Sequence, residues 1–313
     1  MKELSIIIPG FNCEKTIKKC LDSILFNQDL EDIDVFFIND GSNDSTEQIV
    51  YQYMKNEHFH YFYQENLGVS SARNLGIKLS NEYKYLMFVD ADDWLEKKSL
   101  KLIKTQLKLG DYDFLFTNWN NVCLKGKTIT YEKQKIDKYF DKNTNIDDLV
   151  NHFIKYRRGG APWAKVYKTE KIFKYNIFFH KDLPYAEDYI FNLEYLSHCE
   201  KIKYIPEEIY NYNCCIEGEG SKFRKNYFDL FMKIEEYKSK AKIFMELSDK
   251  QKKMDIYEKS TQLIISYRMA YDNRFNKEER QKYIDTIILY AKKQKIKLHN
   301  ILYTLITINK NYS

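Results

Sequence analysis

Glycine and proline are scarce in this sequence, with 10 Gly and 4 Pro among 313 residues. This scarcity excludes collagen-like repeats and flexible linkers, and it argues against an all-β fold with many tight turns. No stretch approaches the 18 apolar residues of a membrane-spanning helix, and the apolar run at residues 4–8 is too short for a secretory signal. Because apolar residues still make up 44% of the chain, it can bury a core. We therefore expect a soluble or peripheral protein of the cytoplasm, with one large domain or two of ordinary size.

The six cysteines form neither a C-x-x-C pair nor a zinc-binding pattern with histidine. Their spacing does not match a disulfide framework either. We expect reduced thiols, as in other cytoplasmic proteins.

Charge is distributed unevenly along the chain. Residues from Lys222 onward hold 21 Lys/Arg and 11 Asp/Glu, a surplus of +10, so residues 1–221 carry −5 of the overall +5. A basic C-terminal region suits an anionic partner, either a membrane surface or an acidic polymer. No nucleic-acid recognition motif accompanies the charge, so we expect no nucleic-acid partner.

Short apolar runs alternate with amphipathic segments through the first 90 residues. The runs are typical of buried parallel strands, and Asn12 is placed to cap the first helix. Such alternation with short connections predicts a parallel α/β sheet with right-handed crossovers. The expected strands are residues 4–8, 34–38, 61–64 and 85–89. The expected helices are one that follows Asn12, with apolar positions from Ile17 to Leu25, and residues 45–55 and 70–79.

Polar clusters follow three of these strands, at residues 9–12, 39–42 and 90–93. Ligands of open α/β sheets bind beyond the carboxyl ends of the strands, so these clusters mark a candidate site. The alternation stops near Asn226, where long segments rich in Lys, Glu and Tyr predict two to four helices.

Asp90, Asp92 and Asp93 are the sharpest chemical feature. Three carboxylates within four residues repel one another unless a cation or hydrogen-bond donors intervene. Oxygen ligands at this spacing suit Mg²⁺ or Mn²⁺ shared with substrate phosphates. The alternative is a turn that caps the segment starting at Trp94, and the motif alone leaves both interpretations open.

Three further positions are ambiguous when each is taken alone. Asp40 can accept a hydrogen bond from a nucleobase while Gly41 admits a close approach of the backbone, or the two form a simple turn. Arg73 suits the bridging of acidic groups and phosphate, or it is a surface charge. Glu187 and Asp188 open a helix, where a carboxylate acts as a general base or only favours the helix dipole.

Taken together and in order, these motifs resemble those of inverting family 2 glycosyltransferases with the GT-A fold, of the bacterial cell-surface polysaccharide type. The resemblance covers roughly residues 4–222, and Phe11 stands where the family usually has Tyr. It is carried by Ser5-Ile-Ile-Ile-Pro-x-Phe-Asn12, Ile38-Asn-Asp-Gly-Ser-x-Asp44, Asn66-x-Gly-x-Ser-x-Ala-Arg-Asn-x-Gly76, Phe88-x-Asp-x-Asp-Asp93, Trp163-x-Lys165, Glu187-Asp-x-x-Phe-Asn192, Tyr210-x-Tyr212 and Gly220-Ser221.

The resemblance implies a Rossmann-like, mostly parallel sheet flanked by helices over residues 1–222, with a helical C-terminal region over residues 223–313. It places Asp188, next to Glu187, as the catalytic base, and Mn²⁺ or Mg²⁺ on Asp92 with Asp90. Trp163, Lys165 and Ser221 fall on the acceptor or diphosphate side. The UDP-sugar is expected over Pro9, Phe11, Asn12, Asp40, Gly41, Arg73, Asp90 and Ala91.

The implied reaction moves glucose, galactose or an N-acetyl form from UDP to a hydroxyl of a saccharide or lipid-linked glycan, with inversion. One alternative is a sugar-1-phosphate nucleotidyltransferase, but no Gly-rich basic loop follows the first strand. Another is a non-catalytic sugar-nucleotide-binding protein, against which the presence of Asp92, Asp188 and Arg73 together argues. The C-terminal helices have several open roles: acceptor binding, peripheral contact with the inner membrane face, homodimer formation or simple packing.

Overall fold

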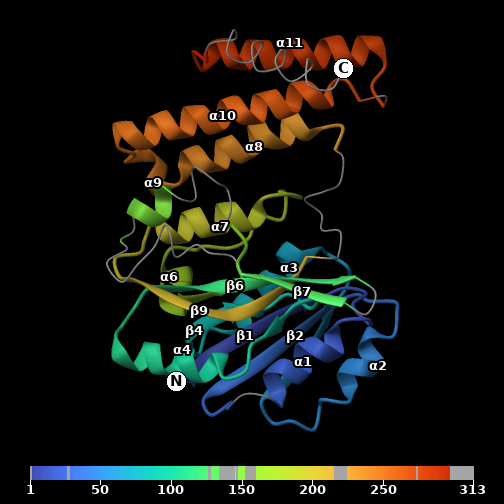
Figure 1. The fold of residues 1–313 in the computed structure, drawn as a ribbon, viewed down its shortest axis with the longest axis vertical. Helices are drawn as coiled ribbons and strands as arrows, with labels where there is room; N and C mark the ends of the chain where they lie inside the picture. The colour runs from blue at the N-terminus through green and yellow to red at the C-terminus, as the bar shows by residue number, and fades with distance from the viewer. Residues whose placement is uncertain are drawn as a thin grey trace. The chain divides into compact units, whose positions relative to one another are not determined.

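The computed structural model describes residues 2–26, 29–125, 128–133, 145, 147–151, 160–214, 224–272 and 274–296 (Figure 1). The chain divides into two compact units. The first unit comprises residues 1–150 and 158–217, and the second comprises residues 151–157 and 218–313. Each unit is described by itself below.

The first unit opens with the predicted alternation of strands and helices. Four parallel strands lie in the order β3-β2-β1-β4, the arrangement expected from short right-handed crossovers. Their bounds are β1 Lys2–Gly10, β2 Ile33–Asp40, β3 Phe59–Gln64 and β4 Tyr83–Phe88, and the helices between them are α1 Ile17–Leu25, α2 Thr46–Tyr51 and α3 Val69–Leu79. The α/β class and all seven expected elements are confirmed, although α2 is shorter than predicted.

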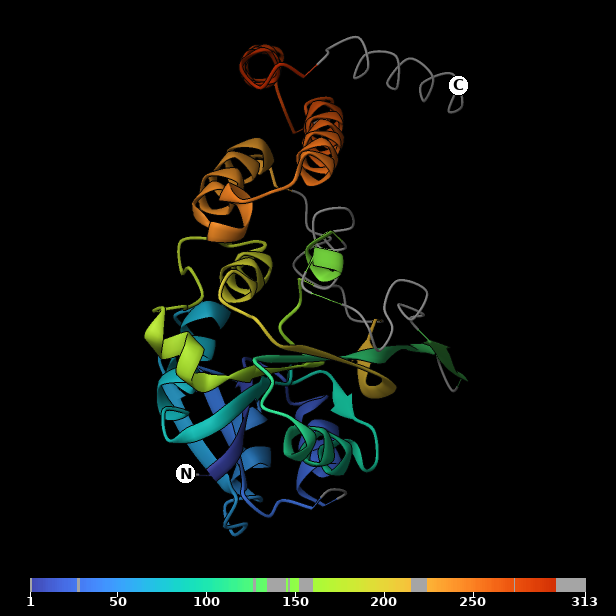
Figure 2. The same cartoon turned by 90° about the vertical axis from the view of Figure 1, so that its left-hand side faces the viewer.

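Beyond β4 the sheet becomes mixed. Strand β8 pairs antiparallel with both β4 and β6, whereas the long strands β6 and β9 run parallel side by side (Figures 1 and 2). Strands β5 and β7 add antiparallel edges to β9 and β6. The bounds here are β5 Trp94–Leu95, α4 Ser99–Leu109, β6 Phe114–Lys125, β7 Thr128–Lys133, β8 Lys165–Lys168, α6 Thr169–Lys174, α7 Glu187–Leu196 and β9 Ile202–Asn213.

The two faces of the parallel strands receive different helices because successive side chains point to opposite faces. Ile6 and Ile8 of β1 share a core cluster with Ile17 and Leu21 of α1. Ile7 faces the other way, where α3 packs so closely that a Cβ on Gly76 would lie 2.2 Å from the Ile7 Cγ2 atom. The sheet is thereby covered on both faces, which leaves the carboxyl ends of its strands to form a site.

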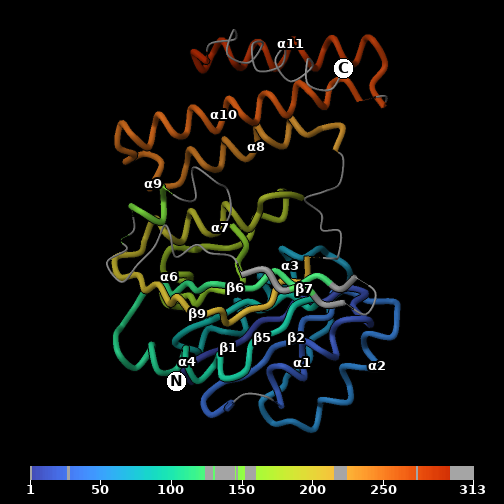
Figure 3. The backbone as a smooth tube through the Cα atoms, in the orientation of Figure 1, coloured from blue at the N-terminus to red at the C-terminus, as the bar shows by residue number. Residues whose placement is uncertain are grey.

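The second unit is helical, with α8 Tyr227–Lys240, α9 Lys242–Met245, α10 Asp249–Met269 and α11 Lys277–Lys293, whose course Figure 3 traces. Ser248 and Asn276 form capping boxes at the starts of α10 and α11. The apolar core of the unit joins Phe228 and Phe231 of α8 to Leu263 of α10 and Tyr290 of α11. Among the described residues, no helix combines the length and apolarity needed to span a bilayer.

Two local expectations are wrong. Asn12 does not cap α1, because the cap position is Thr16 and the Asn12 Oδ1 atom instead accepts a hydrogen bond from the Asn43 backbone N–H at 2.9 Å. The expectation of reduced cysteines fails for Cys123, which is disulfide-bonded, whereas Cys13, Cys20, Cys199 and Cys214 are free thiols.

Candidate active site

The acidic loop that follows β4 brings three carboxylates together. One oxygen each of Asp90, Asp92 and Asp93 lies within 4.8 Å of the others. Asp93 is buried, and its carboxylate accepts hydrogen bonds from the Tyr210 hydroxyl at 2.6 Å and the Asn213 backbone N–H at 2.8 Å. Burial, with the charges of Asp90 and Asp92, raises the pKa of Asp93 well above its usual range. Asp93 therefore anchors the loop to β9.

Asp92 is the carboxylate that the surrounding protein leaves available. Within the described residues, its side chain makes no hydrogen bond or ion pair with another side chain. Burial and the neighbouring Asp90 charge raise its pKa to about 6. A divalent cation would relieve this unfavourable position, and carboxylate oxygens are the ligands that Mg²⁺ and Mn²⁺ prefer, so these residues fit such an ion.

Arg73 connects the acidic loop to the second pair of acids. Its Nη2 atom donates to the Asp90 Oδ1 atom at 3.0 Å, and its Nη1 atom donates to the Glu187 Oε1 atom at 3.2 Å. Only 6% of Arg73 is exposed, and its guanidinium carbon lies 5.2 Å from the centre of the Phe179 ring. Two segments far apart in the sequence therefore meet across one buried cation.

Glu187 and Asp188 begin α7, directly after Ala186 with its left-handed φ of 61°. Burial is the largest cause that raises the pKa of Glu187 to about 7, and the neighbouring Asp188 charge adds to it while Arg73 opposes it. Burial also raises the pKa of Asp188, against the charges of Arg73 and Lys165. Carboxyl groups with raised pKa values at a rigid helix start are suited to accept a proton near neutral pH.

The predicted nucleotide side lies at the ends of β1 and β2. Pro9 is buried in β1, whereas Phe11 is 46% exposed and available for stacking. The Asp40 carboxylate accepts from the Gln64 side chain at 2.7 Å and from the Leu67 and Gly68 backbone N–H groups at 2.9 and 3.0 Å. Asp40 thus holds the loop before α3, and its predicted contact with the nucleobase stays a prediction.

Gly41 has a φ of +74°, and a Cβ there would lie 2.7 Å from the Asn66 backbone nitrogen. The turn after β2 therefore requires glycine at this position for both conformation and space.

Ala91, the other predicted nucleotide-side residue of the acidic loop, is buried.

Two of the residues predicted on the acceptor or diphosphate side, Trp163 and Lys165, are buried. Trp163 is 9% exposed and stacks on the rings of Tyr210 and Tyr212 at centroid distances of 4.9 and 5.3 Å. Lys165 is buried, and its ammonium donates to the backbone carbonyls of Ala161 and Trp163 at 2.7 and 3.3 Å. Burial lowers the pKa of Lys165 to about 7. Ser221 lies outside the described residues.

Sequence reasoning missed the residues that hold the site together. Neither Gln64, as the partner of Asp40, nor Asn213, as the partner of Asp93, stood out from the sequence. The Tyr210 hydroxyl also accepts from the Asp90 backbone N–H at 3.1 Å, so it joins both ends of the acidic loop. The only available signal was the Tyr210-x-Tyr212 alternation, which predicts that two rings share one face of a strand.

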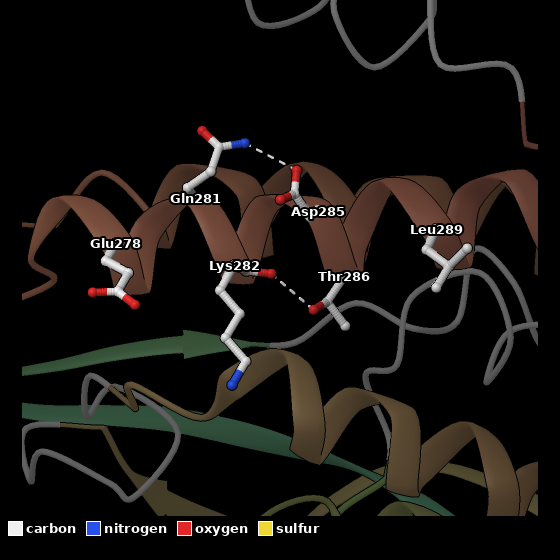
Figure 4. Close-up of a pocket in the computed structure, with 6 residues that line it drawn as sticks. All are labelled: Glu278, Gln281, Lys282, Asp285, Thr286 and Leu289. Atoms are coloured by element: carbon white, nitrogen blue, oxygen red, sulfur yellow. Dashed lines mark hydrogen bonds between the residues drawn. The ribbon is translucent and has the colours of Figure 1, made fainter.

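A pocket on the second unit does not compete as an active site. It has a volume of about 400 Å³ and is lined by six residues that all come from α11 (Figure 4). Gln281 and Lys282 make hydrogen bonds only along the helix, to Asp285 and from Thr286 (Figure 4). One helix surface offers no convergence of chemical groups from different elements.

Comparison with known proteins identifies the family. The sequence profile of "Glycosyl transferase family 2" matches residues 5–164, which include the acidic loop and Arg73. This chain belongs to glycosyl transferase family 2. The uncharacterized glycosyltransferase EpsJ of Bacillus subtilis (strain 168) is 30% identical over 210 residues, which are 67% of this chain and 60% of EpsJ. The poly(ribitol-phosphate) beta-N-acetylglucosaminyltransferase TarS of Staphylococcus aureus is 27% identical over 223 residues, 70% of this chain and 37% of TarS. The chain therefore spans less than two thirds of both relatives.

Solved structures show the same fold. Residues 1–349 of S. aureus TarS, in complex with UDP-GlcNAc, align with a TM-score of 0.64 at 19% identity, covering 94% of this chain and 92% of that one. The mannosyltransferase PcManGT of Pyrobaculum calidifontis, in complex with GDP-Man and Mn²⁺, aligns with a TM-score of 0.54 at 12% identity, covering 98% of this chain and 79% of that one. The predicted GT-A fold of this family 2 glycosyltransferase is confirmed.

Proposed function

We propose that this family 2 glycosyltransferase moves a sugar from a UDP-sugar to a hydroxyl of a saccharide acceptor, with inversion, in the synthesis of a bacterial cell-surface glycan. The donor sugar is glucose, galactose or an N-acetyl form. The observation that carries the proposal is the buried Arg73 side chain. It forms ion pairs both with Asp90, a candidate metal ligand, and with Glu187, the neighbour of the candidate catalytic base. TarS, a beta-N-acetylglucosaminyltransferase solved in complex with UDP-GlcNAc, favours a UDP-sugar donor here.

Departure of UDP develops negative charge on its diphosphate. Asp92 with Asp90 would hold a divalent cation, Mn²⁺ or Mg²⁺, which would supply Lewis-acid stabilisation of that charge. PcManGT was solved with Mn²⁺. The protein's own contribution is to fix the ligands. Tyr210 and Asn213 hold Asp93, and Arg73 holds Asp90, so the Asp92 carboxylate is presented without rearrangement.

The acceptor hydroxyl must lose a proton as it attacks the sugar. Asp188 is the proposed base, because it sits on a rigid helix start beside Arg73 and Lys165, whose charges favour its ionised form. Glu187 pairs with Arg73 and thereby positions the start of α7. One base and one departing diphosphate imply a single displacement, which inverts the anomeric configuration.

The second unit has a proposed role outside the chemistry. Its basic surplus suits a lipid-linked acceptor or peripheral contact with the anionic inner face of the membrane, and a homodimer remains an alternative. A cytoplasmic location agrees with these roles and stays a prediction. The alternative, a non-catalytic protein that binds a sugar nucleotide, requires that Asp92 and Asp188 serve only to bind the ligand.

A donor screen tests the proposal. Release of UDP from UDP-glucose, UDP-galactose and their N-acetyl forms is measured with and without Mn²⁺. Mn²⁺-stimulated release from one donor supports a transferase, whereas tight UDP binding without any release supports the non-catalytic alternative. NMR of the product anomeric proton then distinguishes inversion from retention.

A further inference from the structure

A pocket of the first unit lies between α1 and β5 and has no part in the chemistry described above. Its volume is about 560 Å³, and four lysines line it around Trp94: Lys15, Lys18, Lys19 and Lys97. We refer to it as the lysine pocket. All four lysines are exposed, while Trp94 is buried.

The lysine pocket holds more positive charge than its lining balances, because four lysines line it with only two carboxylates, Asp22 and Glu96. Lys18 pairs with Asp22 at 2.6 Å, and the Asp22 carboxylate also accepts from the Tyr53 hydroxyl at 2.6 Å. Lys15, Lys19 and Lys97 make no ion pair within the described residues, and the other carboxylate in the lining is Glu96. Three ammonium groups therefore face a single remaining carboxylate.

Lys19 shows that this arrangement is built into the structure. Its ammonium lies 2.9 Å from the centre of the Trp94 ring, which holds it in place by a cation–π contact. Burial lowers the pKa of Lys19, and no carboxylate acts in the opposite direction. The protein holds a partly desolvated cation without a counter-charge, and a bound anion would supply one.

The walls of the lysine pocket are fixed to each other and to the acidic loop. The Leu95 backbone N–H donates to the Ser23 Oγ atom at 3.1 Å, which joins β5 to α1. The Cys20 Sγ atom of the same helix lies 3.7 Å from the Asp90 carbonyl oxygen. Since Trp94 follows Asp92 by two residues, the pocket borders the loop that carries the candidate metal ligands.

We propose that the lysine pocket binds a phosphate group of a ligand other than the nucleotide sugar. A phosphate carries up to two negative charges and several acceptor oxygens, so it matches three unpaired ammonium groups better than a single carboxylate does. We further assign this phosphate to the acceptor that receives the sugar, and this assignment rests on the proposed function. The binding itself does not.

The test measures binding rather than turnover, so its failure is distinguishable from failure of the proposed function. The full chain is titrated with sn-glycerol 3-phosphate by calorimetry at low salt, with and without UDP and Mg²⁺. A parallel arm sediments the protein with phosphatidylglycerol vesicles and with phosphatidylcholine vesicles. These arms separate a soluble phosphate from a lipid headgroup as the source of the same chemistry.

The test variant is the triple substitution Lys15→Gln, Lys19→Gln and Lys97→Gln. Its matched control is Lys55→Gln, Lys108→Gln and Lys174→Gln, which removes the same charge from three exposed positions outside the pocket. We expect the pocket variant to weaken binding at least ~10-fold and the control to change it less than ~2-fold, because only the pocket variant loses charge-assisted contacts with the phosphate.

Loss of glycerol phosphate binding in the pocket variant alone, with or without UDP, supports the proposal. Selective loss of phosphatidylglycerol sedimentation also supports it and assigns the phosphate to a lipid. Three results overturn it: no binding of either probe by the wild-type protein, equal weakening in the control variant, or full displacement of glycerol phosphate by UDP.

Discussion

At the scale of single residues, the central question is which carboxylate accepts the proton. Asp188→Asn should retain UDP-sugar binding and lose at least ~10²-fold in kcat, because removal of a general base costs that much or more. Glu187→Gln should lose less turnover than Asp188→Asn, since the glutamine amide oxygen can still accept the hydrogen bond from Arg73 that positions the start of α7. Steady-state kinetics and donor binding of the two variants check this. An inactive Glu187→Gln variant together with an active Asp188→Asn variant would show that Glu187 is the base.

The same pair predicts a pH dependence. A base must be ionised to act, and burial raises the pKa values of both carboxyl groups, that of Glu187 to about 7. Turnover should therefore rise with pH above the range in which an unperturbed carboxyl group titrates, and then level off. In Glu187→Gln the rise should move to lower pH, because one carboxylate no longer opposes ionisation of its neighbour. A profile of kcat that stays flat between pH 5 and 8 would contradict this assignment, as unperturbed carboxylates titrate below ~4.5.

At the scale of elements, the contact between α3 and β1 positions Arg73. A methyl group on Gly76 would lie 2.2 Å from the Ile7 Cγ2 atom, so Gly76→Ala must push the helix from the sheet. We expect a loss of about 1–3 kcal/mol in the free energy of unfolding, as for other overpacked cores. Lys78→Ala, at an exposed position of the same helix, should change it by less than about 0.5 kcal/mol. Urea unfolding followed by tryptophan emission compares the two, and equal stability would show that the helix is free to shift.

The elements also show how far sequence reasoning reaches. The strands from β1 to β4 and the helices between them were predictable, because apolar runs and helical periodicity are local signals. The mixed second half of the sheet was not, since β8 pairs with β4 across a separation of about 80 residues. For the same reason the sequence indicated that Arg73 suits the bridging of acidic groups, but not that the bridged groups are Asp90 and Glu187. It also assigned Trp163 and Lys165 to the acceptor or diphosphate side without indicating their burial, which for Trp163 involves stacking on Tyr210 of β9.

At the scale of the whole molecule, the second unit contains a buried charge cluster that local patterns do not reveal. The Lys238 ammonium lies 2.6 Å from both Glu235 and Asp255 and 3.7 Å from Glu258, with 2% of its side chain exposed. Lys238→Met should cost about 3–5 kcal/mol, because it leaves buried carboxylates with less compensating charge. Lys240→Met, which breaks an exposed pair with Glu236, should cost less than about 1 kcal/mol.

Circular dichroism at 222 nm reports the helices of both units, so a loss of stability that it shows but tryptophan emission does not show belongs to the helical second unit. Tryptophan emission reports only the first unit, where all three tryptophans lie: Trp94, Trp119 and Trp163. A Lys238→Met protein as stable as wild type by circular dichroism would contradict the predicted role of the cluster.

The central claim is that the acidic loop, held by Arg73 and Tyr210, presents Asp92 to a metal ion that assists departure of UDP. The most direct measurement compares UDP release by the wild-type protein and Asp92→Asn, with and without Mn²⁺, at equal helix content by circular dichroism. We expect Mn²⁺-stimulated release by the wild type and loss of that stimulation in the folded variant. Near-normal Mn²⁺-stimulated release by Asp92→Asn would contradict it.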